Sequence, residues 1–455
     1  MNGPGAGGTS GAGGGPGTGA GPGTGGGPGT GGGPGTGGPG TGGPGTGGRP
    51  SPRAAYALWM DACARAGWRA APAAEQVPVA DGLGRVTAAP VLARWPSPRA
   101  DCAAMDGIAV AASALSGPVL DGSARLPGPA FTWIDTGDPV PAGADTVVER
   151  ERVCPQPDGS VAITGLAGPV PPGRNVRAAG EDFTPGQVLV PAGRRLRPAD
   201  LAAAAAGGHA ALAVTRRPVA AIIPTGDEIR PVGSTLRHGE IVDSNSIMLA
   251  ARCRQAGALP VVSDVQPDDP DALAAAIRQC APAADVVLII AGSSRGRGDH
   301  TADVLAQVGG VAVAGAAVRP GHPVLLGHAK PGHARARQPA GAVPVVGLPG
   351  YPLAAAVIFE LFALPVLAAI AGWQRAELTQ RVTLARDWTS PPGVEDWVPV
   401  VLTASPEGTL ATPARRGAGS VSQLARAGAW WRIPIGQGHF TSGSVIEVLP
   451  LPGEP

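Results

Sequence analysis

The stretch that decides the fold is Asp285–Thr301, which reads DVVLIIAGSSRGRGDHT. Its first half is an apolar, β-branched run, which is typical of a strand buried in a parallel sheet. Its second half is a loop of Gly, Ser and Arg that closes on Asp299, His300 and Thr301. Loops after the strands of open α/β sheets bind ligands, and bare N–H groups, hydroxyls and guanidinium groups suit an anion. The spacing matches neither G-x-G-x-x-G nor a P-loop, so the neighbouring segments must decide its function.

Apolar strands and helices alternate on both sides of this stretch, which predicts a doubly wound parallel sheet. We expect helices at Asp243–Gly257, Pro270–Cys280, Thr301–Val308 and Pro352–Trp373. The last is long enough to span a membrane, but Glu360 and Pro365 interrupt it and it lacks a basic flank, so we interpret it as a buried helix.

Five loops rich in Gly, Pro, acids and bases follow the predicted strands: Thr225–Glu228, Gln266–Asp269, Ala291–Asp299, Val318–Pro323 and Gly347–Pro352. Right-handed crossovers bring the C-terminal ends of parallel strands to the same edge of a sheet. We therefore expect these loops to converge on one cleft.

The flanking regions have a different pattern. We expect helices at Ala54–Ala66 and Pro198–Gly207, with a small β module between them. Its predicted extended pieces are Val77–Val79, Val86–Val91, Phe131–Ile134, Thr146–Val148 and Val161–Ile163. After Gly372 short strands predict a compact C-terminal β domain. Met1–Gly48 is a GPGTGG-like repeat with no apolar residues able to offset the entropy of ordering, which predicts a disordered tail, or alternatively a misassigned translation start.

The fold class that follows is multidomain α+β. A central doubly wound α/β domain (216–373) is flanked by a tail (1–50), an N-terminal linker and β region (51–215) and a small β-barrel-like domain (376–455).

Composition excludes several functions. The formal net charge is +1 over 455 residues, which gives no electrostatic case for binding nucleic acid or an anionic membrane. The N-terminus has no secretory signal, and the five dispersed cysteines favour reduced thiols in a cytoplasmic protein. We interpret His322, His328 and His333 as loop histidines, with a metal cluster as the alternative.

The predicted cleft carries two kinds of charge. Ser294, Arg295, Arg297, Arg319 and His322 suit an oxyanion. Asp227, Glu228, Asp243 and Asp299 suit Mg²⁺, which binds one or two carboxylates together with substrate phosphate and water. We interpret Asp269 as a helix cap, and Asp243 and Ser244 are candidate caps of the next helix upstream, with Gly257 just past its end. Anion donors beside metal carboxylates predict a phosphorylated or nucleotidyl substrate.

Eight ordered motifs resemble the MoeA/gephyrin-E family of molybdopterin molybdenumtransferases, from about Ser51 to about Leu451. They are MDGIAV, TGDPVPAGADTVVE, GRNVRAAGED, PTGDEI, DSNSIMLA, QPDDPDAL, VRPGHP and GLPGYPLAAAVIFELF. The resemblance implies a central domain like those of other molybdenum-cofactor biosynthesis proteins. It also implies a cytoplasmic homodimer that inserts molybdate into adenylylated molybdopterin with release of AMP, assisted by Mg²⁺ or another divalent cation.

The resemblance also implies roles for individual residues. The catalytic set is Asp227, Asp299 and Asp106, supported by Glu181. The molybdate set is Ser294, Arg319, Pro320 and His322. The molybdopterin and nucleotide set is Thr225, Gly226, Gly292, Gly350 and Tyr351. The metal set is Asp227, Glu228 and Asp243.

The sequence departs from the family pattern at several of these positions. Arg319 and His322 replace the two lysines of a KPGKP motif, Tyr351 replaces Asn, Ala354 replaces Ser, and Arg297 replaces an acid. The leading hypothesis is an active transferase of a divergent branch. The alternative is a non-catalytic carrier or sensor of molybdopterin or molybdate. A different nucleotide hydrolase is disfavoured because the N- and C-terminal β regions match the family as well.

Overall fold

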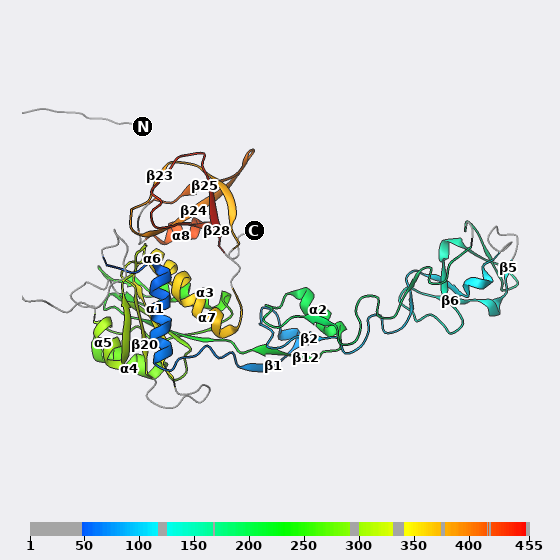
Figure 1. Cartoon of the computed structure of the whole chain (residues 1–455), viewed down its shortest axis with the longest axis horizontal. Helices are drawn as coiled ribbons and strands as arrows, with labels where there is room; N and C mark the ends of the chain where they lie inside the picture. Colours follow the sequence, from blue (N-terminus) through cyan, green and yellow to red (C-terminus); the bar gives the residue numbers. More distant parts are fainter. Residues whose placement is uncertain are drawn as a thin grey trace, which may run out of the picture. The chain divides into compact units, whose positions relative to one another are not determined.

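The structure is a computed structural model that describes residues 48–116, 125–166, 169–291, 300–330, 341–374, 378–415, 417 and 420–451. Within these residues a central sheet has six strands in the order β16-β13-β17-β21-β20-β18 (Figure 1). Their bounds are Leu259–Val262, Val219–Pro224, Val286–Ala291, Val343–Pro349, Leu325–Ala329 and Gly309–Ala314. The apolar first half of the stretch Asp285–Thr301 therefore forms β17, the third strand in this order, which is buried along its full length.

Both faces of this sheet are covered, because successive side chains of a strand point to opposite faces. In β17, Leu288 packs with helices on one face, whereas Val287 and Ile289 pack with helices on the other. The first face is covered by α1 (Pro52–Arg65), α3 (Ser244–Gln255), α6 (Pro352–Ile358) and α7 (Leu364–Ala371). The second face is covered by α4 (Pro270–Cys280) and α5 (Thr301–Val308). The doubly wound architecture is confirmed.

The expectation of an all-parallel sheet is wrong in one respect, because β20 runs antiparallel to both β21 and β18. The chain passes from β18 to β20 through the short connection 315–324, which has no crossover helix and so returns the chain in the opposite direction. Strand β20 also carries His328, so this histidine is a partly buried strand residue, not a loop residue.

Helix ends follow the predicted caps closely. The Asp243 carboxylate accepts a hydrogen bond from the Ser246 N–H (2.9 Å) at the start of α3, and Gly257 follows the end of the helix with φ +83°. The Asp269 carboxylate accepts from the Ala272 N–H (2.8 Å) at the start of α4. Helix α2 (Pro198–Ala206) ends one residue before the predicted Gly207.

The long apolar segment Pro352–Ala371 is buried in the core of the central domain, as predicted. It is long and apolar enough to cross a membrane, but 78% of its most hydrophobic window is buried inside the protein. A π-helical turn at Phe359–Ala363 joins α6 to α7. At this turn the Glu360 carboxylate is buried and pairs with Arg252 of α3.

The N-terminal region contains three hydrophobic clusters among the described residues. One is built from β1 (Ala74–Pro78), β2 (Val91–Leu92), β11 (Val188–Val190), α2 and β12 (Ala211–Thr215). Inserted between β2 and β11 is a unit whose own core includes Ile108 and Val148. Its strands are β3 (Cys102–Ala103), β4 (Gly107–Val110), β5 (Arg125–Leu126), β6 (Thr132–Ile134), β7 (Thr146–Glu149), β8 (Val153–Pro155), β9 (Val161–Ile163) and β10 (Val176–Arg177). The predicted strand Val86–Val91 is reduced to an isolated bridge at Val86 and the short β2.

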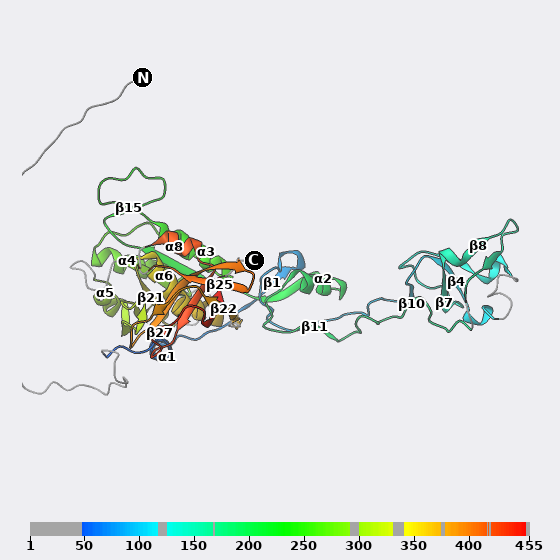
Figure 2. The ribbon, with the colours of Figure 1, turned by 90° about the horizontal axis from the view of Figure 1, so that it is seen from above.

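The C-terminal region is a closed barrel, as predicted. Among the described residues its strands pair in the order β24-β25-β22-β28-β26, with β26 returning to β24. Their bounds are Glu395–Ser405, Gly408–Pro413, Gln380–Leu384, Val445–Pro450 and Ala429–Ile433. The two-residue β19 (Val318–Arg319), which comes from the central domain, pairs with β24. Helix α8 (Val421–Arg426) and the pair β23 (Trp388–Thr389) and β27 (His439–Phe440) complete this region (Figures 1 and 2).

Helix α1 is the first described element, and it belongs to the central core. Trp59 is fully buried there, its indole N–H donates to the Gly327 carbonyl (2.6 Å), and its ring meets Phe362 edge to face. The segment before α1 is held as well, since the Pro50 carbonyl accepts a hydrogen bond from the Ala317 N–H (2.8 Å). Most of the predicted tail, residues 1–47, lies outside the described residues.

We predict that Trp59→Ala lowers the free energy of unfolding by about 3–5 kcal/mol, because it removes a buried aromatic ring and leaves a cavity. Urea denaturation of the full chain measures this change. Trp59→Phe keeps most of the ring and loses the hydrogen bond, so it should cost about 1 kcal/mol for the bond together with a smaller packing loss. Equal stability of the Ala variant and the wild type would contradict the placement of α1 in the central core.

Candidate active site

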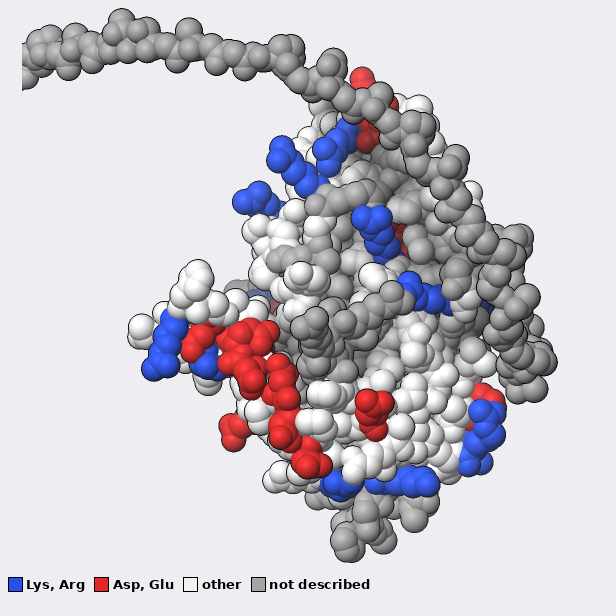
Figure 3. All heavy atoms as spheres, turned by 90° about the vertical axis from the view of Figure 1, so that its left-hand side faces the viewer, with Lys and Arg blue, Asp and Glu red and all other residues white. Residues whose placement is uncertain are grey.

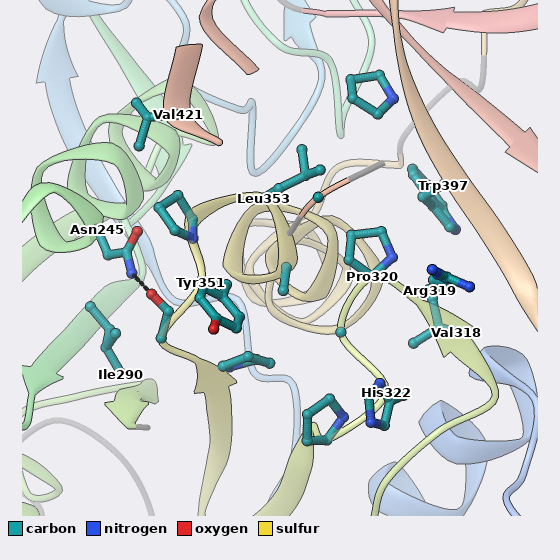
Figure 4. A pocket seen from close by; sticks show the side chains of 18 of the residues that line it. Asn245, Ile290, Val318, Arg319, Pro320, His322, Tyr351, Leu353, Trp397 and Val421 are labelled. Atoms are coloured by element: carbon teal, nitrogen blue, oxygen red, sulfur yellow. Dashed lines mark hydrogen bonds between the residues drawn. The ribbon is translucent and has the colours of Figure 1, made fainter. Parts of the chain in front are cut away.

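A large cavity lies between the central sheet and the C-terminal barrel. Its volume is about 1220 Å³, above the roughly 300–1,000 Å³ of pockets for drug-sized ligands. Three of the five predicted loops contribute to it, after β13, β18 and β21, together with Ala291 at the end of β17; the rest of the predicted loop Ala291–Asp299 before His300 lies outside the described residues. Figure 4 shows Arg319 beside Trp397 on one wall and Asn245 across from them, with Tyr351 between. The cavity has room for a ligand of nucleotide size or larger.

The loop after β13 contributes Thr225 and Glu228 to the cavity lining. Both the N–H and the hydroxyl of Thr225 donate to the Ile290 carbonyl (2.9 and 3.1 Å), which ties this loop to the end of β17. Gly226 adopts φ +141°, a conformation that suits glycine. Asp227 lies outside the described lining, and its carboxylate accepts from the Asp268 N–H (3.2 Å). The predicted loop Gln266–Asp269 therefore lies outside the described lining and contacts the loop after β13 through this bond.

The start of α3 and the loop after β21 form the next part of the lining. Asp243, the cap of α3, lines the cavity. Asn245 is buried, and its side-chain amide donates to the Gly350 carbonyl (2.7 Å; Figure 4). This bond ties the α3 start to the loop that carries Tyr351, whose side chain is 62% exposed. Asn245 was not among the predicted site residues, although it follows Asp243 in the DSNSIMLA motif.

The opposite wall combines the two domains. In the pairing of β19 with β24, Arg319 lies opposite Asp396, and the Glu395 N–H donates to the Ala317 carbonyl (2.9 Å). This register places Arg319, Pro320 and His322 in the lining together with Trp397.

Trp397 is an addition that sequence reasoning missed. Its ring is buried, its indole N–H donates to the Glu395 carboxylate (2.7 Å), and it meets Trp430 edge to face. Trp388 and Arg415 line the cavity as well. Only pairing between distant strands brings these residues to the site, so local sequence patterns offered no signal for them beyond the aromatic residues themselves.

Two predicted site residues lie in the N-terminal inserted unit and are not among the described residues that line the cavity. The Asp106 carboxylate accepts from the Thr136 hydroxyl and N–H (2.6 and 2.7 Å), and these bonds hold the pKa of Asp106 below its ordinary value. Glu181 pairs with Arg177 (3.0 Å). The predicted residues Gly292, Ser294 and Asp299 lie outside the described residues.

Comparison with known proteins agrees with this architecture. Residues 53–208 match the MoeA N-terminal region (domain I and II), 221–369 a probable molybdopterin binding domain, and 381–451 the MoeA C-terminal region (domain IV). A molybdopterin molybdenumtransferase of Nostoc sp. is 32% identical over 394 residues, covering 81% of this chain and 87% of that protein. Molybdopterin molybdenumtransferase 2 of Mycobacterium tuberculosis is 31% identical over 398 residues, covering 82% and 94%. This chain belongs to the MoeA family.

A solved structure of a MoeA protein from Pyrococcus horikoshii has the same arrangement. It superposes with a TM-score of 0.72 at 29% identity and covers 88% of this chain and 98% of that one. The family relationship therefore extends over both β regions and the central domain.

The MoeA relationship makes a divalent cation plausible, so we tested whether the described residues fit one. Among them no group of three or more His, Cys, Asp or Glu side chains is arranged to hold a metal. Mg²⁺ does not require such a cage, because one or two carboxylates suffice when substrate phosphate and water complete its shell. Glu228 and Asp243 both line the cavity and fit this requirement. Figure 3 shows Asp and Glu side chains gathered on one side of the molecular face it displays.

We predict that the pKa of Asp106 in the folded MoeA-type chain is below 3.8, its ordinary value, because two hydrogen bonds from Thr136 favour the ionised form. Thr136→Val removes the hydroxyl donor and should raise this pKa toward the ordinary value. Because folding lowers this pKa, the ionised carboxylate stabilises the folded protein at pH values above the unfolded-state pKa. This stabilisation is lost as the pH falls through the folded-state pKa. Carboxyl titration by NMR measures the pKa of Asp106 in the wild type and in Thr136→Val. An unchanged pKa in the variant would contradict this cause.

We predict that Asp243→Ser separates capping from metal binding. Serine caps helices about as well as aspartate, so the stability of this variant should be near that of the wild type, whereas Asp243→Ala should lose about 1 kcal/mol. If Asp243 binds a divalent cation, Asp243→Ser should still weaken Mn²⁺ binding by about tenfold or more. Electron paramagnetic resonance of Mn²⁺ with the full chain measures this affinity. Asp269→Ser, at another N-cap outside the cavity lining, is the matched control; wild-type Mn²⁺ affinity in Asp243→Ser would remove Asp243 from the metal site.

Proposed function

We propose that this chain is a molybdopterin molybdenumtransferase, which joins molybdate to adenylylated molybdopterin in the cavity between the central domain and the barrel. The observation that carries the proposal is the composition of this cavity. Its lining includes Glu228 and Asp243 from the central domain, Arg319 and His322 with Asp396 opposite Arg319, and the buried ring of Trp397. A large aromatic phosphoanhydride and a small oxyanion need this combination of surfaces.

We propose a role for each set of residues in the cavity walls. Molybdate is a tetrahedral dianion, and the guanidinium of Arg319 supplies positioned donors that favour its binding. The apolar face around Trp397 suits the ring systems of the organic substrate, since aromatic rings stack on aromatic side chains. Thr225 and the Asn245–Gly350 bond keep the loops around the substrate in fixed positions.

A divalent cation held by Glu228 and Asp243 would neutralise the phosphoanhydride and polarise it. The other contribution of the chain is positioning. Molybdenum must meet the dithiolene sulfurs of the pterin while AMP leaves, and holding two reactants in one cavity converts a bimolecular step into a nearly unimolecular one. Asp227, Asp299 and Asp106 remain proposed catalytic residues, supported by Glu181, on the basis of the family resemblance. Gly226 and Gly292, in turn, remain proposed molybdopterin- and nucleotide-binding residues, and Ser294 a proposed molybdate-binding residue.

We further propose that the protein is a cytoplasmic homodimer, as the family resemblance implies. Strand β16, at the edge of the central sheet, leaves the apolar side chains of Leu259, Val261 and Val262 about half exposed. An exposed apolar edge of this kind is suited to association with another copy.

The decisive test is incubation of the full chain with adenylylated molybdopterin, molybdate and Mg²⁺, with AMP measured by chromatography. We expect AMP release that depends on molybdate. Glu228→Gln, which changes a cavity carboxylate, should slow this release by about tenfold or more. Asp271→Asn changes an exposed acid of α4 outside the cavity lining and should leave the rate unchanged. Binding of both ligands without any release of AMP would favour the carrier or sensor over the enzyme.

A further inference from the structure

A second, smaller cavity adjoins the large one. Its volume is about 240 Å³, below the range of pockets for drug-sized ligands, so a small group such as an oxyanion fits it and a nucleotide does not. The two cavities share lining residues, including Arg49 and His322. Among the described residues that line the small cavity, these two are the basic ones and none is a carboxylate.

Arg49 comes from the segment before α1, far in sequence from the other residues of the site. Its backbone is anchored on one side, because the Pro50 carbonyl accepts a hydrogen bond from the Ala317 N–H (2.8 Å). Two residues further on, Ser51 caps α1 through the Ala54 N–H (3.3 Å). Ala317 in turn directly precedes β19, so the same backbone segment positions both Arg49 and Arg319.

The side chain of Arg49 packs against a glycine. A Cβ atom at Gly315 would lie 3.1 Å from Nε and 3.4 Å from Cδ of Arg49. Gly315 therefore leaves room for the arginine to reach the junction of the two cavities. Its φ of +91° also disfavours other residues at this position.

The guanidinium of Arg49 is half-buried and has no carboxylate within ion-pair distance among the residues that the structure describes. The arginines with buried acids nearby, such as Arg216 and Arg252, are committed to Asp285 and Glu360. An arginine that lines a cavity without an acidic partner keeps its charge and its five N–H donors for an anion.

We propose that Arg49 binds the molybdate oxyanion in the small cavity and supplies a permanent positive charge next to His322. The inference rests on the proposed transferase function and adds a binding residue to that site. His322 stands where the family pattern has a lysine, and histidine is cationic only part of the time near neutral pH. Arg49 lines the same two cavities, and a guanidinium group keeps its charge at every physiological pH, so Arg49 supplies a permanent charge beside the histidine.

The direct test measures binding of molybdate by calorimetry to the full chain, without organic substrate. Arg49→Gln keeps hydrogen bonding and removes the charge, and it should weaken binding roughly 10- to 100-fold, as expected for loss of a charge-assisted hydrogen bond. Arg49→Lys keeps the charge without the planar fork and should recover part of the affinity. Arg53→Gln is the control: it removes an exposed arginine from the first turn of α1, and this variant should bind molybdate as the wild type does.

Steady-state AMP release gives the second readout. Arg49→Gln should raise the KM for molybdate and leave the KM for adenylylated molybdopterin unchanged, a split that a general loss of folding would not produce. The midpoint of thermal unfolding of each variant verifies that α1 stays docked.

The outcomes separate the two claims. Wild-type molybdate affinity in Arg49→Gln would overturn the assignment of Arg49, even if the wild type releases AMP. Weakened binding in Arg49→Gln with no AMP release by the wild type would support Arg49 and defeat the transferase. A wild-type chain that binds no molybdate would overturn both.

Discussion

The site depends on the pairing of a strand from the central domain with a strand of the C-terminal barrel. Strand β19 leaves the central domain and pairs with β24 of the barrel, so that Val318 and Arg319 lie opposite Glu395 and Asp396. Backbone hydrogen bonds of this kind specify register, because a shift by one residue would turn each side chain to the other face. The pairing fixes the barrel over the C-terminal edge of the sheet. It thereby converts an open edge with loops into an enclosed cavity and aligns Arg319 with Trp397.

The cavity draws charged residues from several elements. Glu228 and Asp243 come from the loops after β13 and β15 (Ile241–Val242), and Arg319 and His322 come from the connection that contains β19. Asp396 of β24 lines the cavity as well and lies opposite Arg319 in the strand pairing. Several positions that differ from the family pattern lie in this cavity, including Tyr351 and the buried Ala354. The substitutions thus change the surface of this cavity, while the overall fold remains that of the family.

Much of the fold was predictable because its signals are local. The helices α4 and α5 begin and end where the caps and the apolar spacing predict, and Asp243 and Asp269 cap helices as expected. Convergence of three predicted loops and the end of β17 on one cavity followed from the handedness of crossovers. The antiparallel β20 was not predicted, because a short apolar run has no direction until its connection is known. The isolated bridge at Val86 shows the same limit, since strand length depends on the partner strand.

The sequence by itself determined the alternating architecture, the helix ends, the cleft loops and the family, because each depends on residues close together in the chain or on ordered motifs. Tertiary structure alone decided which of those residues share a cavity. It brought Asn245 to Gly350, Trp397 to Arg319 and Arg49 to His322, and it left Asp227 behind the lining. Contacts between residues far apart in the chain arise from strand pairing and burial, and local patterns do not record which distant partner a side chain meets.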